Sequence, residues 1–274
     1  MNKVKLKDKF NSLKQQKKAL LATNFYNLET LQGVATAAQL SQQPLILQLT
    51  KSSIDYMGLP VAVTMARSII DSYNLQSWLH LDHGDSYELA ARCLDAGFDS
   101  VMIDASEKSF EENIKITKSI VKLAESYGAV VEAELGFIAK LGQTNEGAGF
   151  TDPQEAKTFV DETGVDTLAV AIGSAHGFYK QEPKLDLERL KAISIATGIP
   201  LVLHGASGIP DETLVASVER GICKINLATE IKNIFMQTLK TTLGGQEEID
   251  LRKVFPWATK AVTQLVQKKL EVLR

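Results

Sequence analysis

The chain has 274 residues, of which 45% are hydrophobic and 23% are charged, and its formal net charge is −3. This composition supports a large apolar core, and the charge balance gives no electrostatic reason to expect a nucleic-acid partner. No apolar run approaches the roughly 20 residues that a membrane-spanning helix needs, and no apolar signal core follows the basic start. Cys93 and Cys223 lie in separate apolar segments, so we expect packed thiols, a reducing compartment and a cytoplasmic location.

Short apolar runs alternate with amphipathic stretches along nearly the whole chain. Eight runs are predicted to be parallel strands, because such strands are covered on both faces and read as near-continuous apolar segments. They are Leu20–Asn24, Leu45–Thr50, Ser77–Asp82, Ser100–Asp104, Val130–Leu135, Thr167–Ile172, Pro200–His204 and Cys223–Leu227.

Helical patterns lie between these runs, and several of them end in a glycine that fits the left-handed position after a helix. The clearest patterns are Ser86–Ala96, Ser109–Tyr127, Pro153–Thr163, Leu187–Thr197 and Asp211–Arg220, and the glycines are Gly97, Gly128, Gly164, Gly198 and Gly221. Two further helices, Val4–Gln15 and Pro256–Leu273, are expected outside the repeat.

Eight strand-then-helix units predict a (β/α)₈ barrel (a TIM barrel) with extra N- and C-terminal helices, and we expect one domain over residues 1–274. An open doubly wound sheet is the alternative. The absence of any break in composition favours the closed barrel.

Three of the four histidines lie in short polar clusters, each at the end of a hydrophobic run. These are His83, His176 and His204. The carboxyl ends of barrel strands meet at one face, and three imidazoles with an open fourth position are a common way to hold catalytic zinc. Asp82, next to His83, could act as an acid or base on a metal-bound substrate.

Carboxylates also occur at strand ends. Asp104 ends the fourth run, and Glu132 and Glu134 lie two residues apart on one face of the fifth. Buried glutamates are unfavourable unless they bind a metal, pair or reach solvent. A structural and a functional role are equally consistent with Glu132, whereas the position of Glu134 nearer the barrel mouth favours function.

Two other polar residues inside apolar runs favour structural roles. His80 is expected to be a core histidine that is hydrogen-bonded inside the barrel, and Lys224 a structural or outward-facing lysine. The small residues after the last two runs would let backbone N–H groups approach a phosphate, which barrels often bind there.

These clusters resemble the class II, metal-dependent ketose-bisphosphate aldolases, closest to the tagatose- and fructose-bisphosphate branch. The resemblance covers nearly the whole chain. It rests on six ordered motifs: Leu79–Gly84, Ala96–Asp104 with Phe110–Ile114, Val131–Gly136, Ala171–Gly177, Leu201–Gly208 and Gly221–Glu230.

The resemblance implies roles for individual residues. His83, His176 and His204 would bind Zn²⁺, Asp82 would handle the proton of the C4 hydroxyl, and Asp104 and Glu134 would hold a second or displaced metal. The dihydroxyacetone phosphate moiety would contact Gly177, Gly205, Ala206, Ser207, Asn226, Leu227, Ala228 and Thr229. The resemblance also implies a homodimer or homotetramer, and a monovalent cation (Na⁺ or K⁺) held by carbonyl groups near Ala175, Gly177 and Gly205.

Two segments depart from the family pattern. The loop after the fifth run lacks the usual acidic pair, and its only carboxylate is Glu146, which we predict to exchange the proton at the enediolate carbon. Lys51, after the second run, either meets the distal phosphate or carboxylate of a substrate or is simply solvated.

The resemblance therefore predicts an enzyme that reversibly cleaves a phosphorylated ketose, tagatose or fructose 1,6-bisphosphate by default, into dihydroxyacetone phosphate and an aldehyde. The alternatives are an aldolase for a different ketose 1-phosphate or a deoxy-keto acid phosphate, and a catalytically weak paralogue that binds sugar phosphates. A metal-dependent hydrolase is a weaker option, because His80 and His83 do not form the paired His-x-His motif usual in such barrels.

Overall fold

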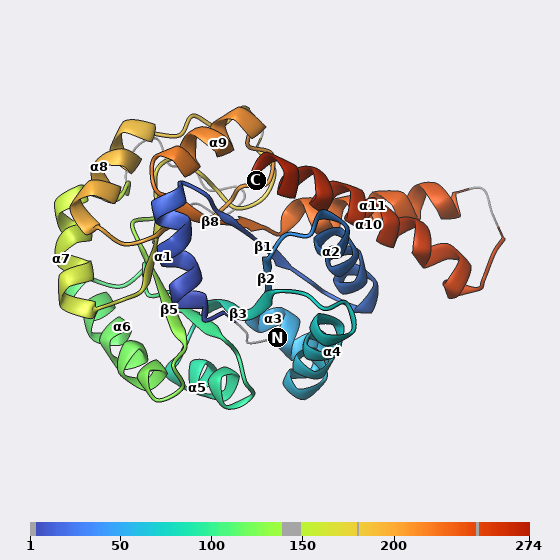
Figure 1. Cartoon of the computed structure of the whole chain (residues 1–274), viewed down its shortest axis with the longest axis horizontal. Coiled ribbons are helices and arrows are strands. Elements are labelled where there is room, and N and C mark those ends of the chain that lie inside the picture. The colour runs from blue at the N-terminus through green and yellow to red at the C-terminus, as the bar shows by residue number, and fades with distance from the viewer. Residues whose placement is uncertain (1–3, 139–148, 180, 245–246) are drawn as a thin grey trace.

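A computed structural model describes residues 4–138, 149–179, 181–244 and 247–274. Eight parallel strands close into a barrel in chain order, with β1 paired to both β2 and β8 (Figure 1). The predicted (β/α)₈ fold is confirmed. The strands are β1 (Leu20–Asn24), β2 (Leu45–Thr50), β3 (Ser77–Gly84), β4 (Ser100–Ile103), β5 (Val130–Leu135), β6 (Thr167–Val170), β7 (Leu201–Leu203) and β8 (Ile222–Leu227).

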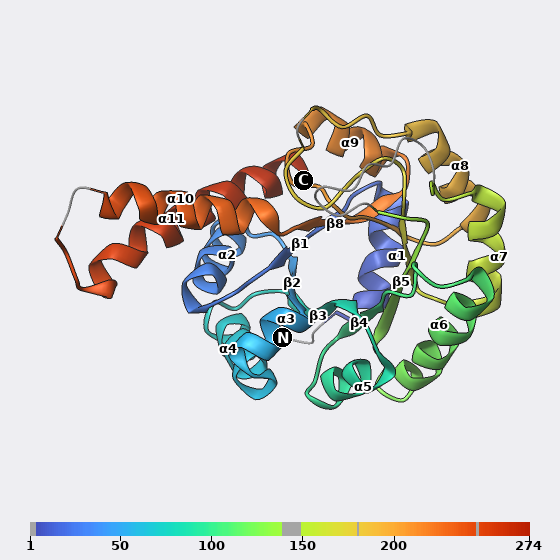
Figure 2. The same ribbon diagram turned by 180° about the vertical axis from the view of Figure 1, so that it is seen from behind.

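Helices surround the barrel, and α10 and α11 extend away from it as a two-helix arm (Figures 1 and 2). The helices are α1 (Leu6–Gln16), α2 (Leu28–Ser41), α3 (Lys51–Met57), α4 (Leu59–Ser72), α5 (Tyr87–Asp95), α6 (Phe110–Glu125), α7 (Pro153–Thr163), α8 (Leu187–Thr197), α9 (Asp211–Glu219), α10 (Thr229–Leu243) and α11 (Leu251–Val272). All five glycines predicted to follow helices have positive φ angles, between 62° and 116°.

Some predicted boundaries are wrong. The C-terminal helix begins at Leu251 instead of Pro256, because the Asp250 side chain caps it by accepting a hydrogen bond from the Arg252 backbone N–H, and the proline lies inside the helix. Strand β3 extends to Gly84, two residues further than predicted, so His83 lies within it. Strands β4 and β7 are shorter than predicted, which leaves Asp104 and His204 just beyond their ends.

The barrel interior is layered from an apolar end to a polar end. Helix α1 covers the amino-terminal end, where its buried face joins an apolar cluster of inward side chains: Leu6, Phe10, Leu13, Leu20, Ala22, Ile46, Trp78, Val130 and Cys223. A buried polar layer follows, containing His80, Glu132 and Lys224. The carboxyl ends of the strands lie beyond this layer. The apolar end excludes water from below, so a site at the polar end opens to one side only.

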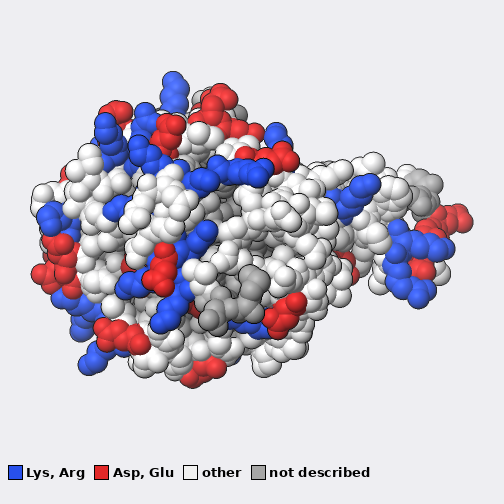
Figure 3. All heavy atoms as spheres, viewed as in Figure 1, with Lys and Arg blue, Asp and Glu red and all other residues white. Residues whose placement is uncertain are grey.

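The face of the molecule shown in Figure 3 carries charges of both signs. On the face in Figure 3, lysine and arginine side chains are interspersed with aspartates and glutamates. Within the described ranges, no helix is both long enough and apolar enough to cross a membrane.

The chain closes on itself through α11, which packs along α2. Thr263 of α11 donates a hydrogen bond to the Gly33 carbonyl at 3.0 Å. Because β1 also pairs with β8, we propose that residues 1–274 fold as one domain.

The contact between α2 and α11 predicts the effect of adding one methyl group. A Cβ atom on Gly33 would lie 2.8 Å from the Thr259 carbonyl oxygen and 2.9 Å from Val262 Cβ. Overpacking of this kind typically costs about 1–3 kcal/mol, so Gly33→Ala should lower the free energy of unfolding by that amount in urea denaturation. Leu40→Ala, near the end of α2 with its side chain 62% exposed, is the control and should change it little. Equal stability of the two variants would contradict this packing.

Candidate active site

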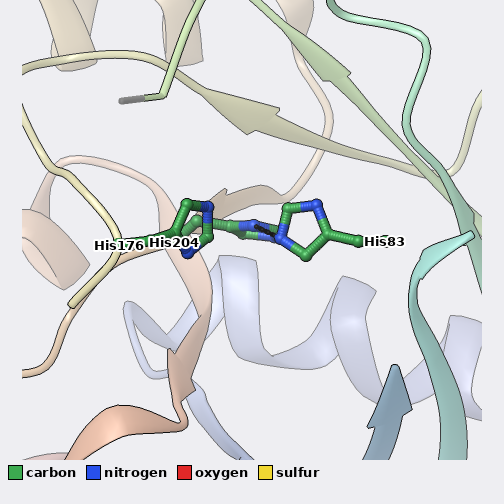
Figure 4. Close-up of side chains that lie close together, drawn as sticks. All are labelled: His83, His176 and His204. Carbon is green, nitrogen blue, oxygen red and sulfur yellow. Dashed lines mark hydrogen bonds between the residues drawn. The ribbon is translucent and has the colours of Figure 1, made fainter. Parts of the chain in front are cut away.

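Three histidines converge at the carboxyl ends of the strands, as the sequence predicts (Figure 4). His83 belongs to β3, His204 follows β7 directly, and His176 lies in the segment after β6. Their ring centroids are 4.7 to 5.8 Å apart, and one ring nitrogen from each lies within 4.8 Å of the others. The arrangement could hold one metal ion.

The backbone of β3 is shaped to direct His83 into this group. His83 has a φ angle of 50°, an uncommon conformation for a non-glycine residue. The pairing of β3 with β4 shifts register between Leu81 and Gly84, and a Cβ atom on Gly84 would lie 2.5 Å from the Met102 carbonyl oxygen. The sequence needs glycine at position 84 because the two strands approach closely there. Strained backbone of this kind is concentrated at functional sites.

Hydrogen bonds fix which ring nitrogens are free to bind a cation. Asp104 lies 2.8 Å from His83 Nδ1, and Glu132 lies 2.9 Å from His204 Nε2, so each carboxylate accepts the N–H of one ring. The remaining nitrogens, Nε2 of His83 and Nδ1 of His204, then face one another at 3.0 Å with only lone pairs. Two acceptors at this distance require a cation, either a proton or a metal ion. The donor set therefore fits a metal.

A further carboxylate points to the same place. Glu134 is buried, and its Oε2 atom lies 3.6 Å from His204 Nδ1 without a hydrogen-bond partner among the described residues. His83, Asp104 and Glu134 form a second group whose potential ligand atoms lie within 4.8 Å of one another. Zinc accepts both imidazole nitrogen and carboxylate oxygen as ligands.

The electrostatics of the metal-free chain favour positive charge on His83 and disfavour it on His204, whose pKa burial lowers. Burial lowers the pKa of His83, but the carboxylates around it, Asp82 first, outweigh burial and raise this pKa to about 9. Burial, together with the nearby charge of Asp104, raises the pKa of Glu134 to about 8. A proton on His83 thus occupies the site in the absence of a metal.

Asp82 lies beside the histidines in a polar frame that keeps it ionised. It accepts hydrogen bonds from Asn24 at 2.9 Å and from Asn226 at 3.2 Å, and Gln48 in turn donates to Asn24. Burial raises the pKa of Asp82, but the histidines, Lys224 and Asn24 together lower it below its usual range. Sequence reasoning missed Asn24 and Gln48, although a polar residue inside an otherwise apolar strand was the available signal.

A cavity of about 220 Å³ opens beside Asp82, His83 and His176. Its lining includes six of the eight residues predicted to contact a triose phosphate: Gly177, Gly205, Ser207, Asn226, Ala228 and Thr229. The side chains of Ala206 and Leu227, the other two, pack in the core. Helix α10 begins at this cavity without a side-chain cap, and Lys232 in its first turns also lines it. The Glu230 backbone N–H donates to Ser207 Oγ, and the helix N-terminus and the lysine together favour an anion.

A second cavity of about 550 Å³ also borders His83 and His176. Asp104 and Glu107 line it together with Lys108. The predicted base Glu146 lies outside the described residues, so its role stays a prediction.

The remaining predictions concern residues away from the cavities. Lys51 pairs with Asp55 on the exposed surface of α3, whereas its neighbours Thr50 and Ser52 line the smaller cavity. His80 is a buried core histidine, as predicted. Lys224 is buried inside the barrel, so the outward-facing alternative is wrong.

Comparisons with known proteins agree with this geometry. The family profile described as fructose-bisphosphate aldolase class-II matches residues 4–274. A fructose-bisphosphate aldolase of Geobacillus stearothermophilus is 38% identical, over 98% of this chain and 96% of its own. One from Helicobacter pylori is also 38% identical, over 92% of each chain.

Solved structures give the same result. The YdjI aldolase of Escherichia coli K12 superposes with a TM-score of 0.88 and 33% identity, over 98% of this chain and 96% of its own. A putative fructose-1,6-bisphosphate aldolase of Coccidioides immitis has a TM-score of 0.89 and 29% identity, over 100% of this chain and 97% of its own. The resemblance predicted from the six motifs is confirmed: the chain belongs to the class II fructose-bisphosphate aldolases, a family of metal-dependent lyases.

Proposed function

We propose that this chain reversibly cleaves a phosphorylated ketose, tagatose or fructose 1,6-bisphosphate by default, into dihydroxyacetone phosphate and an aldehyde. The observation that carries the proposal is the pair of facing acceptor nitrogens on His83 and His204, with His176 and Asp82 beside them. Zn²⁺ bound by the three histidines would supply a Lewis acid that polarises the ketone and stabilises the charge released on cleavage.

Asp82 would remove the proton from the C4 hydroxyl. As the C3–C4 bond breaks, the C4 oxygen becomes the aldehyde carbonyl and the electron pair stays on C3. Protonation of C3 then gives dihydroxyacetone phosphate, and Glu146 is the base we predict for this exchange. The hydrogen bonds from Asn24 and Asn226 support the role of Asp82, because they hold its carboxylate ionised and fixed in direction.

Asp104 and Glu134 would hold a second or displaced metal position next to the first. Their membership of one potential ligand group with His83 supports this role. In the absence of a second ion, Asp104 still orients the His83 ring through its 2.8 Å hydrogen bond.

The phosphate of the triose end would bind between the glycine-rich segment after β7 and the start of α10. The lining of the smaller cavity supports this placement. Ala206 and Leu227 would contribute through their backbone only. A monovalent cation held by carbonyls of Ala175, Gly177 and Gly205 belongs to the same proposal, although the Gly205 carbonyl already accepts a hydrogen bond from the Tyr179 hydroxyl.

A ketose 1-phosphate or a deoxy-keto acid phosphate is the second candidate substrate. The observation that favours it is the position of Lys51, the cation expected at the distal end, which pairs with Asp55 outside the cavity. Lys232 is the only lysine or arginine that lines the smaller cavity within the described part of the chain. A second phosphate therefore has few partners there.

A homodimer or homotetramer in the cytoplasm completes the proposal. The arm formed by α10 and α11 exposes apolar side chains at Ile249, Leu251 and Trp257, which are 91%, 61% and 59% exposed. Apolar side chains this exposed on a projecting element are typical of a surface that another subunit covers.

A substrate panel tests the proposed reaction. Ketose monophosphates and bisphosphates are incubated with the enzyme, and released dihydroxyacetone phosphate and aldehyde are identified by mass spectrometry. We expect cleavage that a chelator abolishes and zinc restores, because the charge on C3 needs a Lewis acid. Full turnover after metal removal, or no cleavage of any member of the panel by the zinc-loaded chain, would overturn the proposal.

Asp82→Asn tests the acid–base role. The amide keeps the shape of the side chain but cannot take the C4 proton, so cleavage should slow by about 10²- to 10⁴-fold. Zinc content and thermal stability should remain near the parent values. A cleavage rate close to that of the parent would move the role to another group.

The raised pKa of His83 predicts how zinc binding depends on pH. Below about 9 the His83 ring holds a proton that zinc must displace, so zinc affinity should rise between about pH 7 and 9 and level off above. Calorimetry in buffers of different ionisation enthalpy should detect at least one proton released per zinc ion at neutral pH. Binding without proton release would show that His83 is already neutral there.

A further inference from the structure

A buried polar layer lies under the proposed metal site, and none of its residues takes part in the proposed cleavage. Glu132 and Lys224 are each about 1% exposed and form a salt bridge in the barrel interior, with Lys224 Nζ lying 2.8 and 3.1 Å from the two carboxylate oxygens. The same nitrogen lies 3.2 Å from His80 Nε2, and His80 Nδ1 lies 2.7 Å from Ser100 Oγ. A buried ion pair is seldom the most stable filling for a core, so its presence here needs another reason.

The charges at the centre of this layer fix the direction of every hydrogen bond in it. An ammonium group has only donors, so His80 must accept at Nε2 and carry its proton on Nδ1, which donates to Ser100. All three N–H groups of Lys224 are then used, two of them on Glu132. An ionised carboxylate has only acceptors, so His204 must donate from Nε2 to Glu132 at 2.9 Å. The lone pair of His204 is thereby placed on Nδ1, which faces His83.

We infer that Lys224 and Glu132 are positioning residues that lock His204 in the tautomer able to bind a metal. Lys224 acts without touching His204 or the substrate: it donates to both carboxylate oxygens of Glu132 and so holds Oε1 toward His204 Nε2, from which that oxygen also accepts. The inference rests on the proposed metal site, but it concerns a proton position that exists with or without the metal.

The layer predicts an unusual response to Glu132→Gln. Lys224 would attract the amide oxygen and leave the amide NH₂ facing His204 Nε2. His204 would then have to accept at Nε2 and move its proton to Nδ1, the nitrogen that binds the metal. Zinc affinity should fall by about 10- to 100-fold, the usual effect of losing a partner that orients a metal-binding histidine.

A second substitution should reverse this effect. In the double variant Glu132→Gln with Lys224→Met, no ammonium competes for the amide oxygen. The amide can turn its oxygen to His204 and its NH₂ to His80 Nε2, which lies 3.8 Å from the Glu132 carboxylate in the parent. Zinc affinity should recover most of the loss, although the double variant carries more changes than the single one.

The experiment has two readouts. The ¹⁵N shifts of the His204 ring, in the metal-free and zinc-loaded chain, report which nitrogen carries the proton, and competition with a chelator measures zinc affinity. We expect Nε2–H in the parent and the double variant, and Nδ1–H in Glu132→Gln. Val130→Ala, on the same face of β5 and within the apolar cluster, is the control for lost packing and should leave both readouts unchanged.

The outcomes separate this inference from the proposed function. If His204 of the parent carries its proton on Nδ1, or if Glu132→Gln binds zinc like the parent, the lock does not exist, whatever the enzyme cleaves. If the double variant binds zinc more weakly than the single one, the layer serves only for packing. The parent spectrum decides the first point even where a variant fails to fold. A parent that shows Nε2–H but binds no zinc supports the tautomer lock and overturns the proposed function instead.

Discussion

The site depends on two ring nitrogens that face one another at 3.0 Å, one from His83 and one from His204. Each nitrogen is an acceptor because a carboxylate, Asp104 or Glu132, binds the opposite side of its ring. Lone pairs held at this distance repel unless a cation lies with them. The protein therefore maintains an arrangement that is unfavourable when empty, and binding of a proton or a metal ion relieves it. The carboxylates around His83, which raise its pKa to about 9, also favour a cation at this point.

The fold creates this arrangement from residues at the carboxyl ends of the strands and from a residue deeper inside the barrel. His83 reaches the centre because β3 continues past Asp82 with a left-handed residue, and Gly84 allows β4 to approach closely enough to hold it. His204 approaches from the opposite side of the barrel, directly after the short strand β7. Its partner Glu132 lies one layer deeper, above the apolar cluster that α1 completes. The two facing nitrogens thus come from opposite sides of the barrel, and neither β3 nor β7 alone could position both.

Much of this was predictable from the sequence, because the features concerned are local. Apolar runs predict the strands, and glycines such as Gly164 predict the helix ends. Each histidine of the triad comes at the end of such a run. The boundary errors arose where a side chain outside the periodic pattern decides the end, as Asp250 does for α11. The direction of Lys224 was not predictable. An isolated lysine in an apolar strand gives no sign of its partner, and Glu132 lies 92 residues away in the chain.

The polar layer under the site shows why proton positions are the least accessible part of the prediction. Sequence motifs identify which groups meet, but a histidine can bind a metal only through the nitrogen that lacks a proton. Residues further from the metal position determine which nitrogen that is. Ser100 and Lys224 form hydrogen bonds with His80, Lys224 also pairs with Glu132, and Glu132 accepts from His204. Apolar side chains of similar volume in place of the buried pair should leave the barrel folded, since such replacements are often neutral or stabilising. What they would remove is the reason for His204 to present Nδ1. The layer is therefore better explained by the requirements of the site than by those of the fold.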